Sequence, residues 1–217
     1  MSMICWIIGL KPAQMAALRT TPSLVRGLVV VAQDDRPKPN FDEAIKRMSP
    51  EQRKRFDAYQ AALEASERKA QAATAEARKQ LATLGALERP LNLEKSWHIL
   101  HYLFTGHVGP ANAPGDLLLT GEDLGEDLGY GPARLHSETA TQAFSQFLDT
   151  QELERLQARI DLREMLRLGV YGVPMGPGSD ADYANELRGE VGVYFPSLHS
   201  YVRQMSDNGN GLLVWLV

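Results

Sequence analysis

Two apolar runs lie at opposite ends of the 217-residue chain, and they constrain its fold more than any other feature. The first, MSMICWIIGL, covers residues 1–10, and the last, GLLVWLV, covers residues 211–217. Each reads as a short buried strand, and the segments between them are mainly helical. Strands at both ends of a helical chain are typical of an α+β domain whose termini pair in one small sheet. We therefore expect a mostly helical, single α+β domain over residues 1–217.

A long polar helix is expected to start at Ser49 and to run to about Leu84. Ser49, Pro50 and Gln52 have the spacing of a capping box, in which Ser caps the helix and Gln reaches back to it. Large apolar residues are sparse beyond this point, so the helix can be buried only along a thin stripe. We interpret residues 41–90 as a protruding helical insertion or arm, preceded by a proline-containing linker at 34–40.

Two roles fit the composition of this arm. It is rich in Ala, Glu, Gln, Lys and Arg, which is typical of a solvated helix that packs through its alanines. The same composition suits an arm that binds another protein or a second copy of the chain. The sequence leaves both roles open.

Charge and cysteine content exclude several classes of protein. A net charge of −4 with 44% hydrophobic residues is ordinary for a globular protein and does not favour nucleic acid as a partner. The N-terminal run lacks the basic residues of a signal peptide, and no apolar run is long enough to span a membrane. Cys5 is the only cysteine, which excludes an intrachain disulfide and a Cys-based zinc cluster. These features predict a cytoplasmic protein without membrane or nucleic-acid partners.

Motifs for cofactors and nucleophilic catalysis are absent from the sequence. The glycine-containing stretch GVPMGPGSD at 172–180 lacks the Lys-Ser/Thr of a phosphate loop. No Gly-x-Ser-x-Gly elbow occurs, and the thiolate of Cys5 is disfavoured within an apolar strand. We expect no cofactor and no bound metal, and these patterns leave open whether the protein is an enzyme.

The stretch EKSWHILHYLFTGH, residues 94–107, holds three of the five histidines of the chain. On a helical wheel for residues 93–105, one stripe is apolar and faces the core, and the neighbouring stripe is polar. The apolar stripe contains Leu93, Trp97, Leu100 and Phe104. The polar stripe contains Glu94, His98, His101 and Thr105. Gly106 is expected to end the helix as a C-cap residue, with His107 beyond it.

The two histidines of the polar stripe admit structural and functional roles. Their spacing differs from that of the zinc-protease motif HExxH, and no third ligand is identifiable, so a metal site is disfavoured. A hydrogen bond to a backbone carbonyl of a neighbouring loop is the favoured role of His101. A solvated or Glu94-paired position is favoured for His98. The functional alternative is proton transfer or ligand contact by His101, with His98 as a further ligand contact.

The loop GYGPAR, residues 129–134, is the second candidate site. Its glycines and proline fix a tight backbone path that presents Tyr130 and Arg134, an aromatic ring and a guanidinium suited to carboxylate or phosphate. These two residues are candidate ligand contacts. The structural alternative is a corner in which Tyr130 is packed and Arg134 is paired with a carboxylate of GEDLGED at 121–127.

Three further elements are expected. DLLLTG at 116–121 reads as a short strand, and residues 150–169 read as a helix that ends at Gly169. The last third of the chain reads as a helix interrupted at Pro196, followed by an Asn-Gly turn into the terminal strand.

Four blocks of this sequence resemble the YfbM-like family, a bacterial family of domains of unknown function. They are MSMICWI, LNLEKSWHILHYLFTG, DLGYGPARLHS and LHSYVRQMSDNGNGLLVWLV. The resemblance lies mostly outside residues 34–90, and it implies a small cytoplasmic α+β domain without implying an activity. It matches the family's Leu-His pair to Leu100 and His101, and the family's Tyr-Gly-Pro-x-Arg loop to Tyr130 and Arg134.

Two functions follow as hypotheses. The first is a non-catalytic binding or accessory protein that engages another protein through the 41–90 arm or a groove near it. The second is a small-molecule site between the histidine helix and the 129–134 loop, in which Arg134 holds an anionic group, Tyr130 packs on it and His101 moves a proton.

Overall fold

The computed structural model describes residues 3–29 and 48–217. The expected linker at 34–40, and the start of the expected arm at 41–47, lie outside these residues. The elements in chain order are β1 (Cys5–Leu10), α1 (Pro12–Thr20), the 3-10 helix η1 (Pro22–Leu24), α2 (Val25–Val29), α4 (Pro50–Thr83), β2 (Leu91–Glu94), α5 (Ser96–Thr105), β3 (Glu122–Leu124), β4 (Ala133–His136), α6 (Glu138–Asp149), α7 (Leu153–Ala158), α8 (Leu162–Leu168), α9 (Asp180–Asp207) and β5 (Gly211–Leu216).

The two terminal strands form the middle of a five-stranded sheet with the order β2-β1-β5-β4-β3. Strands β1 and β5 are antiparallel, in a register that runs from Cys5 opposite Leu216 to Leu10 opposite Gly211. The other described strand pairs are also antiparallel. This arrangement confirms the predicted mostly helical α+β domain and the predicted meeting of the chain termini.

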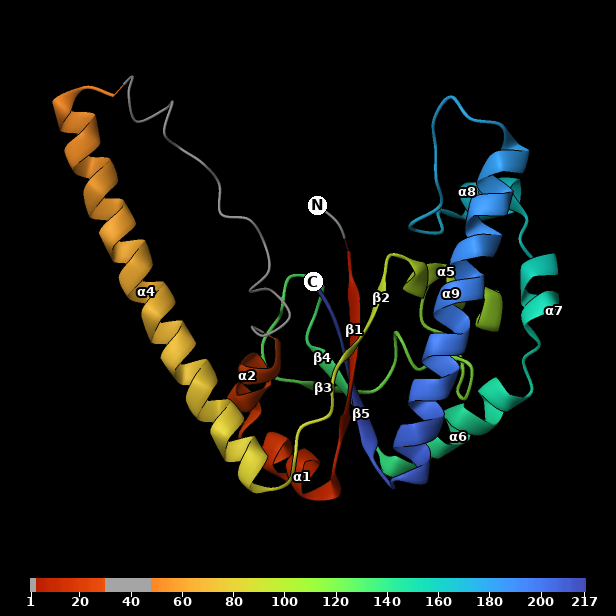
Figure 1. Ribbon diagram of the computed structural model, residues 1–217, viewed down its shortest axis with the longest axis horizontal. Coiled ribbons are helices and arrows are strands. Elements are labelled where there is room, and N and C mark those ends of the chain that lie inside the picture. The colour runs from red at the N-terminus through yellow and green to blue at the C-terminus, as the bar shows by residue number, and fades with distance from the viewer. Residues whose placement is uncertain (1–2, 30–47) are drawn as a thin grey trace.

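The sheet separates two apolar cores, because successive strand residues face opposite sides. Ile7 and Val214 belong to the core shared with α5, α6 and α9, which we call the α9-side core. Ile8 and Trp215 belong to the core shared with α1, α2 and α4, which we call the α4-side core. Figure 1 shows α4 with α1 and α2 on one side of the sheet and α5 with α6 to α9 on the other. Each of the two candidate sites can therefore be assigned to one side of the sheet.

Helix α4 begins with the predicted capping box. The Oγ atom of Ser49 accepts the backbone N–H of Gln52 at 3.3 Å, and the Gln52 side chain accepts the backbone N–H of Ser49 at 2.9 Å. Pro50 occupies the first helical position, where the missing N–H has no helical acceptor. The predicted long helix is thereby confirmed from Pro50 to Thr83.

Within the described residues, the C-terminal part of α4 packs against the body. A Cβ atom added to Gly27 of α2 would lie 2.6 Å from Cβ of Ala77, so the two helices are in close contact there. The side-chain amide of Gln14 donates to the carbonyls of Leu81 and Gly85, at 3.3 Å and 2.9 Å. Figure 1 shows the N-terminal part of α4 running away from the sheet. The helix therefore projects from the domain as an arm.

The histidine helix begins later than the wheel over residues 93–105 assumes. Leu93 and Glu94 belong to β2, and α5 begins at Ser96. The carboxamide of Asn92 accepts the backbone N–H of Glu94 at 2.7 Å, and Glu94 has a positive φ of 47°. This local turn separates strand from helix, so the predicted alignment of Glu94 with His98 and His101 is wrong.

Two other elements differ from the prediction. Residues 116–121 are not a strand, because the carboxylate of Asp116 accepts the Leu119 N–H and turns the chain. The predicted helix 150–169 is divided into α7 and α8, because Asp161 caps a new helix through the N–H of Glu164. It does end at Gly169, as predicted.

Helix α9 continues through Pro196 instead of being interrupted there. Proline lacks the N–H that a helix interior requires and disturbs the preceding turn. The missing N–H would have bonded to the carbonyl of Gly192, and the hydroxyl of Ser197 donates to the neighbouring carbonyl of Val193 at 2.8 Å. Phe195 and Leu198 on either side of the proline are buried, so packing against the core also maintains the helix.

No helix within the described ranges combines the length and apolar character needed to cross a bilayer.

Candidate functional site

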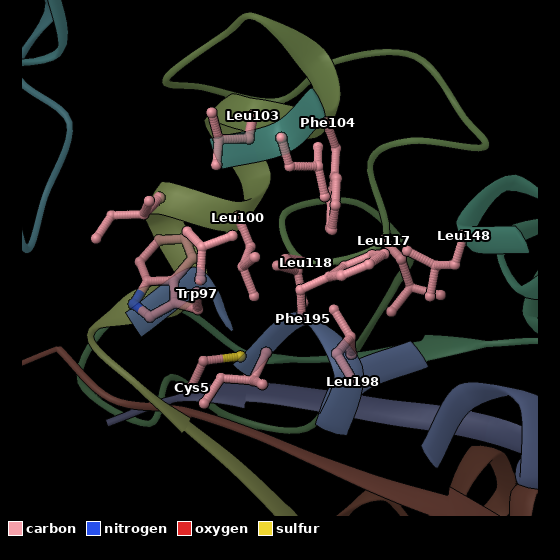
Figure 2. Packing of buried hydrophobic residues seen from close by; sticks show 14 of the residues in the cluster. Cys5, Trp97, Leu100, Leu103, Phe104, Leu117, Leu118, Leu148, Phe195 and Leu198 are labelled. Atoms are coloured by element: carbon pink, nitrogen blue, oxygen red, sulfur yellow. The ribbon is translucent and has the colours of Figure 1, made fainter. Parts of the chain in front are cut away.

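The predicted core-facing stripe is confirmed for all four of its members. Trp97, Leu100 and Phe104 of α5 are buried in the α9-side core, and so is Leu93, which lies on β2. Figure 2 shows Trp97 and Leu100 approaching Cys5 of β1, with Phe195 and Leu198 of α9 beside them. Burial raises the pKa of the Cys5 thiol, in agreement with the predicted disfavoured thiolate. This part of α5 is a packing surface.

His98 joins two loops and is not solvated. Its Nε2 atom lies 2.8 Å from the carbonyl of Val108, and its Nδ1 atom accepts the backbone N–H of Tyr171 at 2.7 Å. A carbonyl can only accept, so Nε2 carries the proton and both nitrogens are satisfied in the neutral ring. Burial lowers the pKa of His98, which agrees with that neutral form. The predicted solvated or Glu94-paired position is wrong, and ligand contact by His98 stays a prediction.

His101 makes the predicted hydrogen bond to a loop carbonyl. Its Nε2 atom lies 2.9 Å from the carbonyl of Gly109, and the side chain is fully buried. The Nε2 proton is therefore donated to Gly109, and Nδ1 has no hydrogen-bond partner among the described residues. Nδ1 lies 3.5 Å from Oδ1 of Asp116, within ion-pair distance but without a hydrogen bond. A role for His101 in proton transfer stays a prediction.

Asp116 organises the loop between α5 and β3. The side chain is fully buried, and its two oxygens accept the backbone N–H groups of Ala111 at 2.6 Å and Leu119 at 3.0 Å. The hydroxyl of Thr120 also donates to the Asp116 carbonyl, at 2.5 Å. A buried carboxylate with such partners stabilises one loop conformation. Asp116 was not predicted from the sequence. The sequence feature that could have indicated it is an acidic residue directly before the apolar run LLL.

His136 on β4 is the second polar residue that sequence reasoning missed. Strand alternation places Leu135 in the α4-side core, so Arg134 and His136 face the α9 side. Burial lowers the pKa of His136 to about 4, against the opposing effects of the Leu117 carbonyl and the Asp116 charge. The available signal was the Arg-x-His spacing within a strand.

Arg134 and Tyr130 lie on the same side of the sheet as the histidines. Tyr130 packs against the α9-side core, and Arg134 acts electrostatically on His136. Arg134 does not pair with the GEDLGED carboxylates. Glu122 pairs with Arg19 at 2.8 Å, Glu126 pairs with Arg26, and Asp127 accepts the N–H groups of Gly129 and Gly131. The predicted packing of Tyr130 is confirmed, and the predicted ion pair of Arg134 is wrong.

The four histidine, aspartate and arginine side chains form one polar cluster, which we call the β4 cluster: His101, Asp116, Arg134 and His136. Asp116 interacts with His101 and with His136, and His136 interacts with Arg134. Within the described chain, no direct contact joins His101 and Arg134. The described part of the chain contains no group of three or more His, Cys, Asp or Glu side chains arranged for a metal ion. His101, Asp116 and His136 are buried and Arg134 is half-buried, so the present geometry supports loop anchoring better than turnover of a substrate.

The opposite side of the sheet carries an open groove of about 510 Å³. We call it the α2–α4 groove, because Gly27 of α2 and Ala70, Ala73 and Thr74 of α4 line it. Leu128 adds apolar surface, and Arg26 and Asp127 supply charges of both signs. A smaller groove of about 370 Å³ shares Ser23, Arg26 and Leu128 with it. This side therefore offers a surface that a partner can reach.

Helix α4 exposes most of its length beside this groove. Apart from the half-buried Phe56 and Gln60, the described side chains from 51 to 73 are exposed. Tyr59 is 63% exposed, whereas Ala77 and Leu81 are buried. The surface is thus continuous with the part of α4 that packs on the body.

Comparison with known proteins gives a family and a fold. The chain matches the family described as "Domain of unknown function (DUF1877)" over residues 1–215, a range that includes residues 41–90. Among solved structures, the crystal structure of YfbM, a protein of unknown function from Escherichia coli, is similar, with a TM-score of 0.56 and 15% sequence identity. The similarity covers 99% of each chain. No curated protein matches the chain.

Proposed function

The chain belongs to the DUF1877 family of YfbM-like domains, to which no activity is assigned, and we propose that it is a non-catalytic binding protein that holds a helix of another protein against α4. The observation that carries the proposal is that α4 is a long helix whose buried residues lie near its C-terminal end. The helix has 34 residues, and its buried residues Ala77 and Leu81 lie near its C-terminal end.

One stripe of α4 links the anchored part to the exposed part. At 100° per residue, Tyr59, Ala70 and Ala73 fall on the same face as Ala77 and Leu81. The face that packs on α2 at its C-terminal end therefore continues toward the N-terminus as exposed surface. An exposed apolar stripe of this kind is suited to helix-in-groove recognition.

The chemistry of the stripe favours a helix as the bound partner. Small side chains such as Ala70 and Ala73 allow two helix axes to approach closely, roughly 8 Å apart. Tyr59 supplies a large side chain of the type that anchors interfaces. Arg26 and Asp127, at the groove, match a partner helix that carries mixed charges beside an apolar stripe.

We propose the cytoplasm as the site of action. The support is the single cysteine, which is free and buried in β1 and suits a reducing compartment. The alternative of a small-molecule enzyme has weaker support, because His101 is fully buried and engaged with Gly109.

Photo-crosslinking in the native cell tests this proposal. A photoreactive phenylalanine derivative replaces Tyr59 in one variant and Val193 in a control, since Val193 is 62% exposed on α9. The proposal predicts one dominant adduct with another protein from position 59 and none from position 193. A crosslink to a second copy of the chain would replace the proposal by self-association, and identical adducts from both positions would refute it.

A further inference from the structure

Three buried polar atoms without a hydrogen-bond partner belong to the β4 cluster. They are Nδ1 of His101, Nη1 of Arg134 and Nε2 of His136. In the described part of the chain only one other such side-chain atom occurs, Nε1 of Trp215, which lies in the α4-side core. A buried polar atom without a partner costs about 1–3 kcal/mol. The described residues alone therefore leave the cluster incomplete.

We propose that Arg134 and His136 bind an oxyanion, the phosphate or carboxylate group of a small ligand, on the α9-facing side of β4. This site is separate from the α2–α4 groove and independent of the proposed protein partner. Its two donors stand at alternate positions of one strand, so both side chains point to the same side of the sheet.

Arg134 supplies the charge of the proposed site. No ion pair or hydrogen bond to its guanidinium is seen across residues 3–29 and 48–217. A guanidinium offers donors only and binds phosphate and carboxylate through two parallel hydrogen bonds. Arg134 is half-buried, but its Nη1 atom is buried without a partner, and a buried donor of a charged group calls for an anionic acceptor.

His136 supplies a second donor when it is protonated. His136 is 6% exposed, and burial lowers its pKa. The Leu117 carbonyl, the Asp116 charge and the Thr120 carbonyl favour the protonated form, whereas the charge of Arg134 disfavours it. An added oxyanion would favour that form further. Binding of the oxyanion should therefore raise the pKa of His136 above its value of about 4.

Two carboxylates near the proposed site compete with a bound anion. Asp116 has both oxygens occupied by backbone N–H groups and lies at ion-pair distance from His101. Asp123 stands opposite Arg134 in the β3–β4 pair and faces the same side of the sheet, yet forms no ion pair with it. Asp123 is exposed, so its charge is screened by solvent.

Little of the protein lies between the proposed site and solvent. Gly121 is exposed, and a Cβ atom added to it would lie 2.9 Å from Nε2 of His136 and 3.1 Å from Cβ of Arg134. One glycine backbone thus separates His136 from solvent at this point. Arg134 is half-buried, so its guanidinium extends from the core toward the surface at Gly131.

Thermal unfolding in sodium phosphate, sodium acetate and sodium chloride at equal ionic strength tests the proposal. Phosphate or acetate, at about 100 times its dissociation constant, should raise the Tm by roughly 5–10 °C above chloride. The increase in Tm should be lost in Arg134→Gln and enhanced in Asp123→Asn. The matched control Arg163→Gln, at an exposed arginine of α8, should keep it. The more effective of the two anions identifies the class of ligand.

A second measurement does not depend on the folding of Arg134→Gln. Proton NMR of the wild-type histidine rings should show that the effective anion raises the pKa of His136 and leaves the exposed His107 unchanged. The proposal is overturned if neither anion exceeds chloride in its effect on the Tm, or if the His136 titration is the same with and without both anions.

Discussion

The Nδ1 atom of His101 lies 3.5 Å from Oδ1 of Asp116, and both side chains are fully buried. The two residues come from α5 and from the loop that follows it. His101 holds the loop at Gly109, and Asp116 holds it at Ala111 and Leu119. The long loop between α5 and β3 is therefore ordered by side chains instead of by secondary structure.

Asp116→Asn is expected to lower the free energy of unfolding by about 3 kcal/mol. An Asn amide has one oxygen, so its NH₂ group would face a backbone N–H that the carboxylate now accepts. Urea denaturation checks the free energy, and hydrogen exchange should show faster exchange at Ala111 and Leu119. Asp123→Asn is the control, because Asp123 is exposed and its replacement should change stability by less than about 0.5 kcal/mol.

His98→Ala is expected to cost about 2–4 kcal/mol, because it leaves the Val108 carbonyl and the Tyr171 N–H without their partner. The matched control is His107→Ala, at an exposed histidine just past the same helix. Chemical denaturation of both variants checks the difference. Equal stability of the two variants would show that His98 does not hold the loops together.

Stability is expected to fall below neutral pH because of His136. Its pKa is lowered from 6.5 to about 4 on folding, so the unfolded chain binds the proton more readily. The stabilisation is complete above pH 6.5 and is lost progressively as the pH falls toward 4, by about 3 kcal/mol in total. His98, whose pKa is also lowered, acts in the same direction.

Urea denaturation at several pH values between 7 and 4 measures this loss. His136→Gln removes the titrating group, so its free energy of unfolding should depend less steeply on pH than that of the wild type. Parallel curves for the two proteins would contradict the assignment of this pH dependence to His136.

Gly27→Ala and Gly189→Ala are expected to change stability in opposite directions. A Cβ at Gly27 would overlap Cβ of Ala77 at 2.6 Å and push α4 from α2, which should cost about 1–3 kcal/mol. A Cβ at Gly189 of α9 meets no atom within 4 Å, so alanine there should stabilise by about 0.5–1 kcal/mol. Thermal unfolding of the two variants measures the decrease in stability at Gly27 and the increase at Gly189. A stabilising effect at Gly27 would show that α4 is not held tightly there.

Features set by local sequence were predictable. The capping box at Ser49, the C-cap at Gly106 and the apolar runs of β1 and β5 each depend on residues close together in the chain. The hydrogen bond of His101 to a loop carbonyl followed from its position at the edge of an apolar stripe.

Features set by contacts between distant residues were not predictable. His98 bonds to Tyr171, 73 residues away, and no local pattern indicates this contact. Asp116 and His136 acquire their roles only when the loop after α5 meets β4. The helical wheel also placed Glu94 beside the histidines, because periodicity alone does not show that Glu94 is the last residue of a strand.

The affinity of α4 for the protein crosslinked at position 59 shows whether α4 holds a helix of another protein. Ala73→Arg adds a long charged side chain to the groove-facing stripe, and Ala72→Arg adds the same side chain to the exposed opposite face. Calorimetric titration of the purified partner should give a dissociation constant at least about tenfold larger for Ala73→Arg, a loss of about 1.4 kcal/mol, and an unchanged value for Ala72→Arg. Equal affinities for wild type, Ala73→Arg and Ala72→Arg would contradict the account.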